Sequence, residues 1–253
     1  MDFNLDAAKS DTIKAKHFLS KGGRFRALLL LGRGEHGEVR SFEDCAVKVI
    51  RGSDSDRDAK ILMKRSEDGI KQGLKFAPVL DTGFFDNLYT FSPRLYGVQL
   101  SDWFRVCQTP LKLLEELTTV MDIGKEGIAS FFEESIKLHE IGIRPDFIRR
   151  SNLIITKNQE SKKQSISVVD FHDCREIREL DPWKKQVILE EATEMLLGDT
   201  LFAGNAHMDE KTDEVYRKLL EDVREVLTQI QHNSYALRRV DYMEGRDYLK
   251  GND

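Results

Sequence analysis

The sequence is poor in the residues that disulfide-rich, zinc-binding and membrane-spanning proteins need. It has three cysteines in 253 residues, and they lie far apart without a C-x-x-C pair: Cys45, Cys107 and Cys174. This scattered, odd count predicts a reducing compartment, with no disulfide framework and no zinc site of ordinary spacing. No apolar stretch approaches the roughly 20 residues that span a bilayer, and no basic region followed by an apolar run marks a secretory signal. We therefore expect a cytoplasmic protein, with export that needs no cleaved signal as the open alternative.

Positive charge is not in excess either. The net charge is −5, which argues against a general nucleic-acid binder because such proteins usually carry a basic excess. The hydrophobic fraction of 40% and the charged fraction of 33% are typical of a folded, soluble chain. At 253 residues the chain is long enough for one large domain or for two small lobes that share a cleft.

Short apolar segments between turns predict a first part built mostly from strands. A polar, partly helical stretch ends at Gly22-Gly23, and a buried strand follows it. Two short strands around the turn Glu43-Asp44, a helix through Ala59 and a further strand pair come next. These strands are expected at 25–31, 39–42, 45–50, 78–80 and 87–91.

From Thr109 onward the pattern becomes helical. Thr109 suits an N-cap, Pro110 suits the first helical position, and Gly142 suits a helix end. The apolar periodicity predicts a hairpin of two short strands among several helices. The helices are expected around 110–121, 128–138, 187–197 and 216–230, and the hairpin at 153–155 and 166–169. The chain is therefore predicted to be α+β, with a sheet-rich lobe followed by a helix-rich lobe.

A glycine-rich turn lies in the first lobe, where Gly32, Gly34, Gly37 and Val39 match G-x-G-x-x-G-x-V. Glycines let backbone amides approach phosphate oxygens, although a simple glycine-rich hairpin would give the same letters. The turn runs into a strand rather than a helix, which disfavours a dinucleotide-binding fold. Lys48 follows on an otherwise apolar strand. Such a lysine either meets an anion or reaches water from an edge strand.

A second group of polar residues follows in the helical part. Asp146 and Asn152 bound a polar loop between a helix and a strand, and the next strand ends in Asp170-Phe171-His172. This order is similar to H-R-D-L-x-x-x-N followed by D-F-G. Together with the glycine turn and Ala46-Val47-Lys48, it resembles the protein-kinase-like superfamily over about residues 25–175, in a compact form similar to lipopolysaccharide-core kinases and minimal effector kinases. Taken singly, these residues could also be loop residues that cap turns.

The resemblance implies a bilobal protein-kinase-like fold that binds ATP and Mg²⁺. Residues 1–22 would be an N-terminal extension, 23–97 an N-lobe with a small antiparallel sheet, and 98–253 a helical C-lobe without an evident activation segment. The hinge between the lobes would lie near 92–97. Gly32, Gly34 and Gly37 would cover the phosphates, and Val39 and Ala46 would complete the nucleotide site.

The resemblance also implies roles for the charged residues. Lys48 would hold the α- and β-phosphates, and Asp58 would pair with it in place of the family's glutamate. Asp146 would orient the acceptor hydroxyl and accept its proton. Asn152 and Asp170 would hold Mg²⁺ between the phosphates.

Some positions depart from the family's pattern. Arg144-Pro145 replaces the usual His-Arg, the loop that ends at Asn152 is one residue longer, and His172 replaces a glycine. No A-P-E motif follows Asp170, so a peptide-docking platform is not visible. We expect transfer of the γ-phosphoryl group of ATP to a hydroxyl acceptor, with a Ser/Thr residue of a protein favoured over a sugar-type small molecule. The alternative is a pseudokinase that binds nucleotide or a partner protein without turnover.

Overall fold

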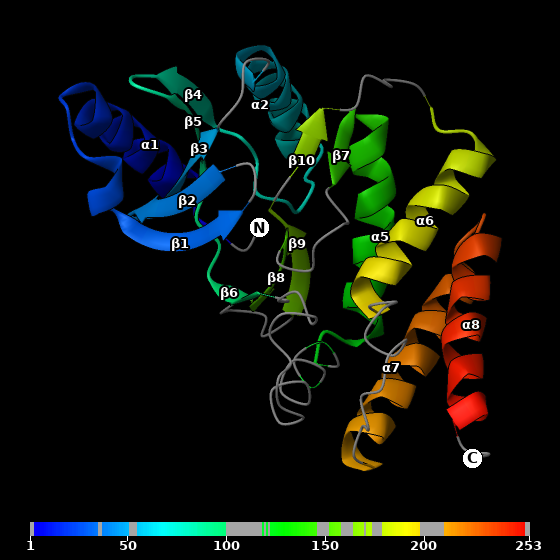
Figure 1. Cartoon of the computed structure of the whole chain (residues 1–253). Coiled ribbons are helices and arrows are strands. Elements are labelled where there is room, and N and C mark those ends of the chain that lie inside the picture. The colour runs from blue at the N-terminus through cyan, green and yellow to red at the C-terminus, as the bar shows by residue number, and fades with distance from the viewer. Residues whose placement is uncertain are drawn as a thin grey trace. The chain divides into compact units, whose positions relative to one another are not determined.

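The computed structural model describes an α+β protein in two compact units (Figure 1). Unit 1 consists of residues 1–96, 141–144 and 171–176, and unit 2 consists of residues 97–140, 145–170 and 177–253. The described residues are 3–34, 37–50, 55–99, 118, 120, 122–145, 152–157, 164–169, 171–173, 179–197 and 210–250. Within these ranges, no helix is long and apolar enough to cross a membrane.

Unit 1 contains a five-stranded antiparallel sheet in the order β1-β2-β3-β5-β4. Its central strand, β3, alternates buried and half-exposed residues, as expected for a strand with one face on a core. The strands predicted at 39–42 and 45–50 are confirmed. The five strands are β1 (Leu29–Gly34), β2 (Gly37–Phe42), β3 (Cys45–Ile50), β4 (Asp81–Phe84) and β5 (Leu88–Pro93).

Helix α1 (Leu5–Ser20) covers one face of this sheet, where its apolar side meets β3 and β5. The side chain of Asn4 caps its first turn, and Gly22, at φ 81°, ends the helical stretch in a conformation that glycine adopts without strain. The helix and the sheet share one core. Its buried members are Ala15, Leu19, Cys45, Val47, Val49, Tyr89 and Phe91.

The prediction of a buried strand at 25–31 is wrong. Phe25–Ala27 forms a short 3₁₀ turn, η1, and β1 begins only at Leu29. Leu29, Leu30 and Leu31 are 62%, 41% and 37% exposed. The reason is the position of β1 at the edge of the sheet, where no neighbouring strand covers it.

The first strand of the pair predicted at 78–80 begins later, at Asp81. Val79 is buried like a strand residue, but its N–H donates to the Ser66 side chain (3.0 Å) and not to a neighbouring strand. Ser66 lies on α2 (Ser55–Lys71), the predicted helix through Ala59. The segment therefore meets the sheet only at its last residue, where the N–H of Leu80 donates to the carbonyl oxygen of Phe91 in β5 (2.7 Å), and the burial of Val79 explains the early prediction.

A two-stranded sheet joins two further segments of the chain, β7 (Ile143–Pro145) and β10 (Phe171–Asp173). The ring of Phe171 meets the buried ring of Phe76 edge to face, with centroids 5.5 Å apart. The Arg65 guanidinium donates to the carbonyl of Gly142. Segments far apart in sequence thus pack against α2 in unit 1.

Unit 2 combines a three-stranded sheet, in the order β6-β8-β9, with a group of helices. Its strands are β6 (Gly97–Gln99), β8 (Leu153–Lys157) and β9 (Gln164–Val168), which confirms the predicted hairpin. The helices are α5 (Gly124–Glu140), α6 (Pro182–Leu197), α7 (Glu210–Gln229) and α8 (Ser234–Lys250). Gly142, at φ 81°, ends α5 as predicted. The helix predicted at 110–121 lies almost wholly outside the described residues.

Candidate functional site

The residues predicted to bind nucleotide in the first lobe lie on one face of the unit 1 sheet. Residues directly opposite each other in an antiparallel pair project to the same side. The register pairs Gly32 with Val39 and Val39 with Lys48. The same side holds, by register and alternation, Gly34, Gly37 and Ala46. We call this side the Lys48 face and the opposite side, covered by α1, the α1 face.

A β-bulge brings the first two glycines to the Lys48 face. Leu30 pairs with Arg40 and Gly32 pairs with Val39, so Leu31 is an extra residue in β1. In a regular ladder Leu31 would face Val39, and Gly32 would face Glu38 on the α1 face. Because a slip of one residue moves every side chain to the other face, the bulge decides which side of the sheet the glycines occupy.

Gly37 and the stem of Lys48 are close neighbours. A Cβ added to Gly37 would lie 2.1 Å from the carbonyl oxygen of Val49 and 4.0 Å from Cε of Lys48. The first contact is with backbone and leaves no room for a side chain. The half-exposed Lys48 therefore runs beside the end of the glycine turn, as a phosphate-binding lysine would need to do.

The predicted partner of Lys48 lies on helix α2. Asp58 is in the first turns of this helix and is half-buried. Lys48 has contacts of its own, and its pairing with Asp58 stays a prediction.

In unit 2 the predicted metal ligand Asn152 is held at the open end of the β8–β9 hairpin. It is 8% exposed, and its carbonyl oxygen accepts a 2.9 Å hydrogen bond from the N–H of Val169. Val169 is the residue before Asp170 in the chain. The backbone thus brings Asn152 and Val169, the residue before the predicted ligand Asp170, to the same end of one hairpin.

Asp146 and Asp170 themselves lie outside the described residues, but the strands beside them do not. Pro145 ends β7 and Phe171 begins β10, and these two strands pair in one sheet. The described part of the chain contains no cluster of three or more His, Cys, Asp or Glu that could hold a metal ion. The two predicted Mg²⁺ ligands would not form such a cluster, because Asn152 is an amide and Asp170 lies outside the described residues.

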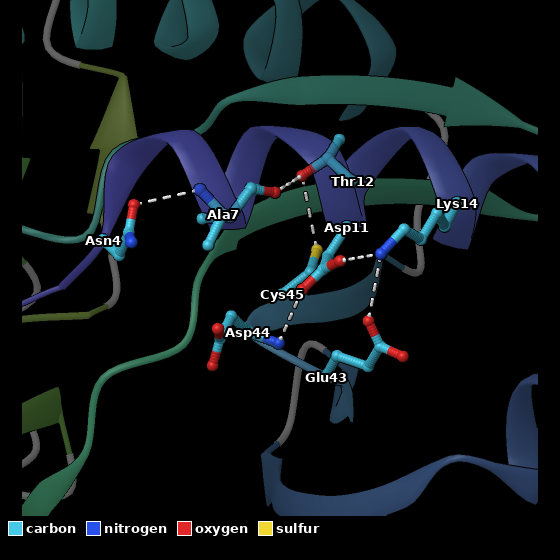
Figure 2. Close-up of polar contacts among 9 residues, drawn as sticks. Asn4, Ala7, Asp11, Thr12, Lys14, Glu43, Asp44 and Cys45 are labelled. Carbon is cyan, nitrogen blue, oxygen red and sulfur yellow. Dashed lines mark hydrogen bonds and ion pairs between the residues drawn. The ribbon is translucent and has the colours of Figure 1, made fainter.

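A polar junction that was not predicted from the sequence joins α1 to the β2–β3 turn (Figure 2). Asp11 is 5% exposed; its carboxylate accepts from Lys14 Nζ at 2.8 Å and from the N–H of Asp44 at 3.2 Å. These bonds, that from Lys14 first, hold the pKa of Asp11 below 3.8. Figure 2 shows Lys14 also reaching Glu43, at 3.3 Å.

Beside this junction the Thr12 hydroxyl lies 3.4 Å from Sγ of Cys45. Burial raises the pKa of the Cys45 thiol to about 11, so the sulfur stays protonated and behaves as part of the core. The residues 1–22, predicted as an extension, are therefore joined to the sheet by charged bonds and by core packing.

Neither a protein-family model nor a curated protein matches the sequence.

Proposed function

We propose that the chain is an ATP-dependent phosphotransferase of the protein-kinase-like superfamily, with residues 23–97 as its N-lobe and 98–253 as its C-lobe. The observation that carries the proposal is the Lys48 face, on which every predicted nucleotide-binding residue of the sheet gathers: Gly32, Gly34, Gly37, Val39, Ala46 and Lys48. A chance match to a glycine motif would not also put the lysine of the third strand beside the last glycine.

Further support comes from the order of the elements. In protein kinases a glycine-rich loop covers the phosphates and the phosphate-binding lysine lies on the third strand. Here Lys48 lies on β3, and a helix follows before β4. In the chain, Asp146 comes after helix α5 and strand β7, and Asp170 comes between β9 and β10. Strands β7 and β10 pair in one sheet.

The proposed chemistry needs positioning and charge neutralisation more than covalent participation. Lys48 would bind the α- and β-phosphates, and Asp146 would accept the proton of the acceptor hydroxyl as the γ-phosphoryl group is transferred. Asn152 and Asp170 would hold Mg²⁺, which supplies positive charge to the phosphates. The acceptor would be a Ser/Thr hydroxyl of a protein or a hydroxyl of a sugar-type molecule.

Calorimetric titration with Mg·ATP, together with a transfer assay using labelled ATP, tests the proposal. Lys48→Met should weaken Mg·ATP binding at least about tenfold, since a charge-assisted contact to phosphate is lost. Lys75→Met is the matched control, because Lys75 is an exposed residue of unit 1 outside the Lys48 face. Wild type that fails to bind Mg·ATP, or a Lys48→Met variant that binds as well as Lys75→Met, would contradict the proposal.

A pseudokinase is the second candidate, and departures from the family's pattern favour it. Arg144-Pro145 replaces the usual His-Arg, and His172 replaces the glycine of D-F-G. Binding of Mg·ATP without transfer to any acceptor or to water would favour this candidate over the enzyme.

A further inference from the structure

Three charged residues lie on the α1 face of the β1–β2 hairpin, directly behind the glycine turn. Glu38 and Arg40 are 8% and 7% exposed, whereas Arg33 is exposed. Burying charged side chains is costly unless they are paired. Two apolar residues at the same positions often stabilise a protein as well as a buried ion pair does. A buried ion pair at this position therefore calls for a role other than stability.

The contacts of this cluster reach both sides of the bulge at Leu31. Before the bulge, Arg40 Nη1 donates to the carbonyl oxygens of Arg26 (2.9 Å) and Leu28 (2.5 Å). After the bulge, Arg33 Nε lies 3.5 Å from Glu38 Oε2.

Glu38 connects the two sets of contacts, because it also forms an ion pair with Arg40. The Arg40 guanidinium lies over the ring of Phe25, 5.6 Å from its centroid, at the margin of the core. The chain before Leu31 and the chain after it are thus tied to the same two side chains of β2.

We propose that Glu38 and Arg40 are positioning residues that fix the bulged register of β1 and so keep Gly32 and Gly34 on the Lys48 face. Without these ties, β1 can slip by one residue to the regular ladder, in which Gly32 faces Glu38. Arg33 would then exchange faces with the glycines and leave its place beside Glu38. This inference rests on the proposed function for its consequence, which is Mg·ATP binding, but not for the register itself.

The register can be measured without nucleotide. Cross-strand NMR contacts between the backbones of Gly32 and Val39 should be present in wild type and weakened or replaced by Gly32–Glu38 contacts in Arg40→Met. Arg40→Lys keeps the charge but cannot fork to two carbonyls and the carboxylate at once, so it should be intermediate. Arg24→Met is the matched control, since Arg24 is an exposed arginine just before η1, near the carbonyls that Arg40 binds in sequence but outside the cluster.

The consequence is measured by titrating each variant with Mg·ATP and with adenosine. A shifted register should weaken Mg·ATP at least tenfold in Arg40→Met and in Glu38→Gln, and change adenosine binding by less than threefold. Deleting Leu31 removes the bulge but leaves Gly32 opposite Val39, so Arg40→Met in this deletion background should keep both the Gly32–Val39 contacts and the Mg·ATP affinity of the deletion variant, with the unit still folded by circular dichroism.

The outcomes separate the two proposals. Unchanged Gly32–Val39 contacts in Arg40→Met and Glu38→Gln would overturn the register role. So would an equal loss of Mg·ATP and adenosine binding, which is what general destabilisation gives. Wild type that shows the bulged register but binds no Mg·ATP would overturn the proposed function and leave the register role standing.

Discussion

The hydroxyl of Tyr96 donates a 2.7 Å hydrogen bond to the carboxylate of Asp44, which joins the end of the first segment of unit 1, residues 1–96, to the turn between β2 and β3. The carbonyl of Asp44 also accepts from the N–H of Arg94 at 2.8 Å, and its own N–H donates to Asp11. Asp44 therefore contacts both the N-terminal helix α1 and the chain that leaves the sheet. Its two partners in that chain, Arg94 and Tyr96, lie in the predicted hinge segment 92–97.

The bond to Asp44 should contribute modestly to stability. Tyr96→Phe removes the hydroxyl but keeps the ring. The Arg94 guanidinium carbon lies over this ring, 4.6 Å from its centroid. Because the site is exposed, we expect the free energy of unfolding to fall by about 0.5 kcal/mol. Urea denaturation of this variant beside Tyr235→Phe, another ring stacked by an arginine, checks it. Equal stability of the two variants and wild type would mean that the bond contributes nothing.

Asp11 should make the stability of unit 1 depend on pH in acid. Its folded pKa is lowered from 3.8, chiefly by the bond from Lys14, so its contribution is complete above 3.8. The contribution is lost as the pH falls through the lower, folded value. Unfolding free energies of wild type and Asp11→Asn, measured in urea between pH 7 and pH 2.5, should therefore differ at neutral pH and converge in acid. A difference that stays constant with pH would contradict the assignment.

Two glycines of the turn should respond differently to alanine. In Gly37→Ala the new Cβ meets the Val49 carbonyl oxygen at 2.1 Å, and we expect a loss of about 1–3 kcal/mol in stability. Gly32 has nothing within 4 Å of an added Cβ, so Gly32→Ala should leave stability unchanged. It should still weaken Mg·ATP binding, because the methyl group would stand where the proposed site brings phosphate to the backbone. Thermal melts and calorimetry on both variants separate the two effects; full Mg·ATP affinity in Gly32→Ala would count against the nucleotide face.

The two predicted aspartates should separate binding from chemistry. Asp170→Ala removes the proposed Mg²⁺ ligand and should weaken Mg·ATP binding as well as turnover. Asp146→Ala should leave nucleotide affinity nearly unchanged and lower kcat about 100-fold or more, the usual scale for losing a positioned base. Titration and a transfer assay on both variants test this. Full activity of Asp146→Ala would show that the longer loop has displaced it from the reaction.

The strands with a neighbour on each side were predicted from the sequence, whereas the two edge strands, β1 and β4, were predicted to begin too early. Cys45–Ile50 was readable as a strand because it is a short apolar run that only Lys48 interrupts, and its alternation of buried and half-exposed residues follows from its two neighbouring strands and α1. The run Leu28 to Leu31 looks equally buried, yet its exposure depends on strand order, which local composition does not encode.

The candidate site was predicted in its residues but not in what orients them. The glycine motif and Lys48 could be read directly, because their spacing reflects a turn and the strands after it. The bulge at Leu31 left no signal, since a slip of one residue changes no composition. Asp11 and Arg40 also resembled ordinary surface charges, because their burial depends on contacts with distant segments.

The two ends of the β8–β9 hairpin are well separated, and the candidate ligand Asn152 lies at one of them. Asn152 and Val169 lie at the open end, whereas Lys157 and Gln164 form the last pair at the end that residues 158–163 connect. With a rise of about 3.3 Å per residue, roughly 17 Å of paired strand separates the two ends. A label attached at the Lys157–Gln164 end of the hairpin would therefore lie about this distance from Asn152, which makes this end suitable for labelling the protein in binding measurements.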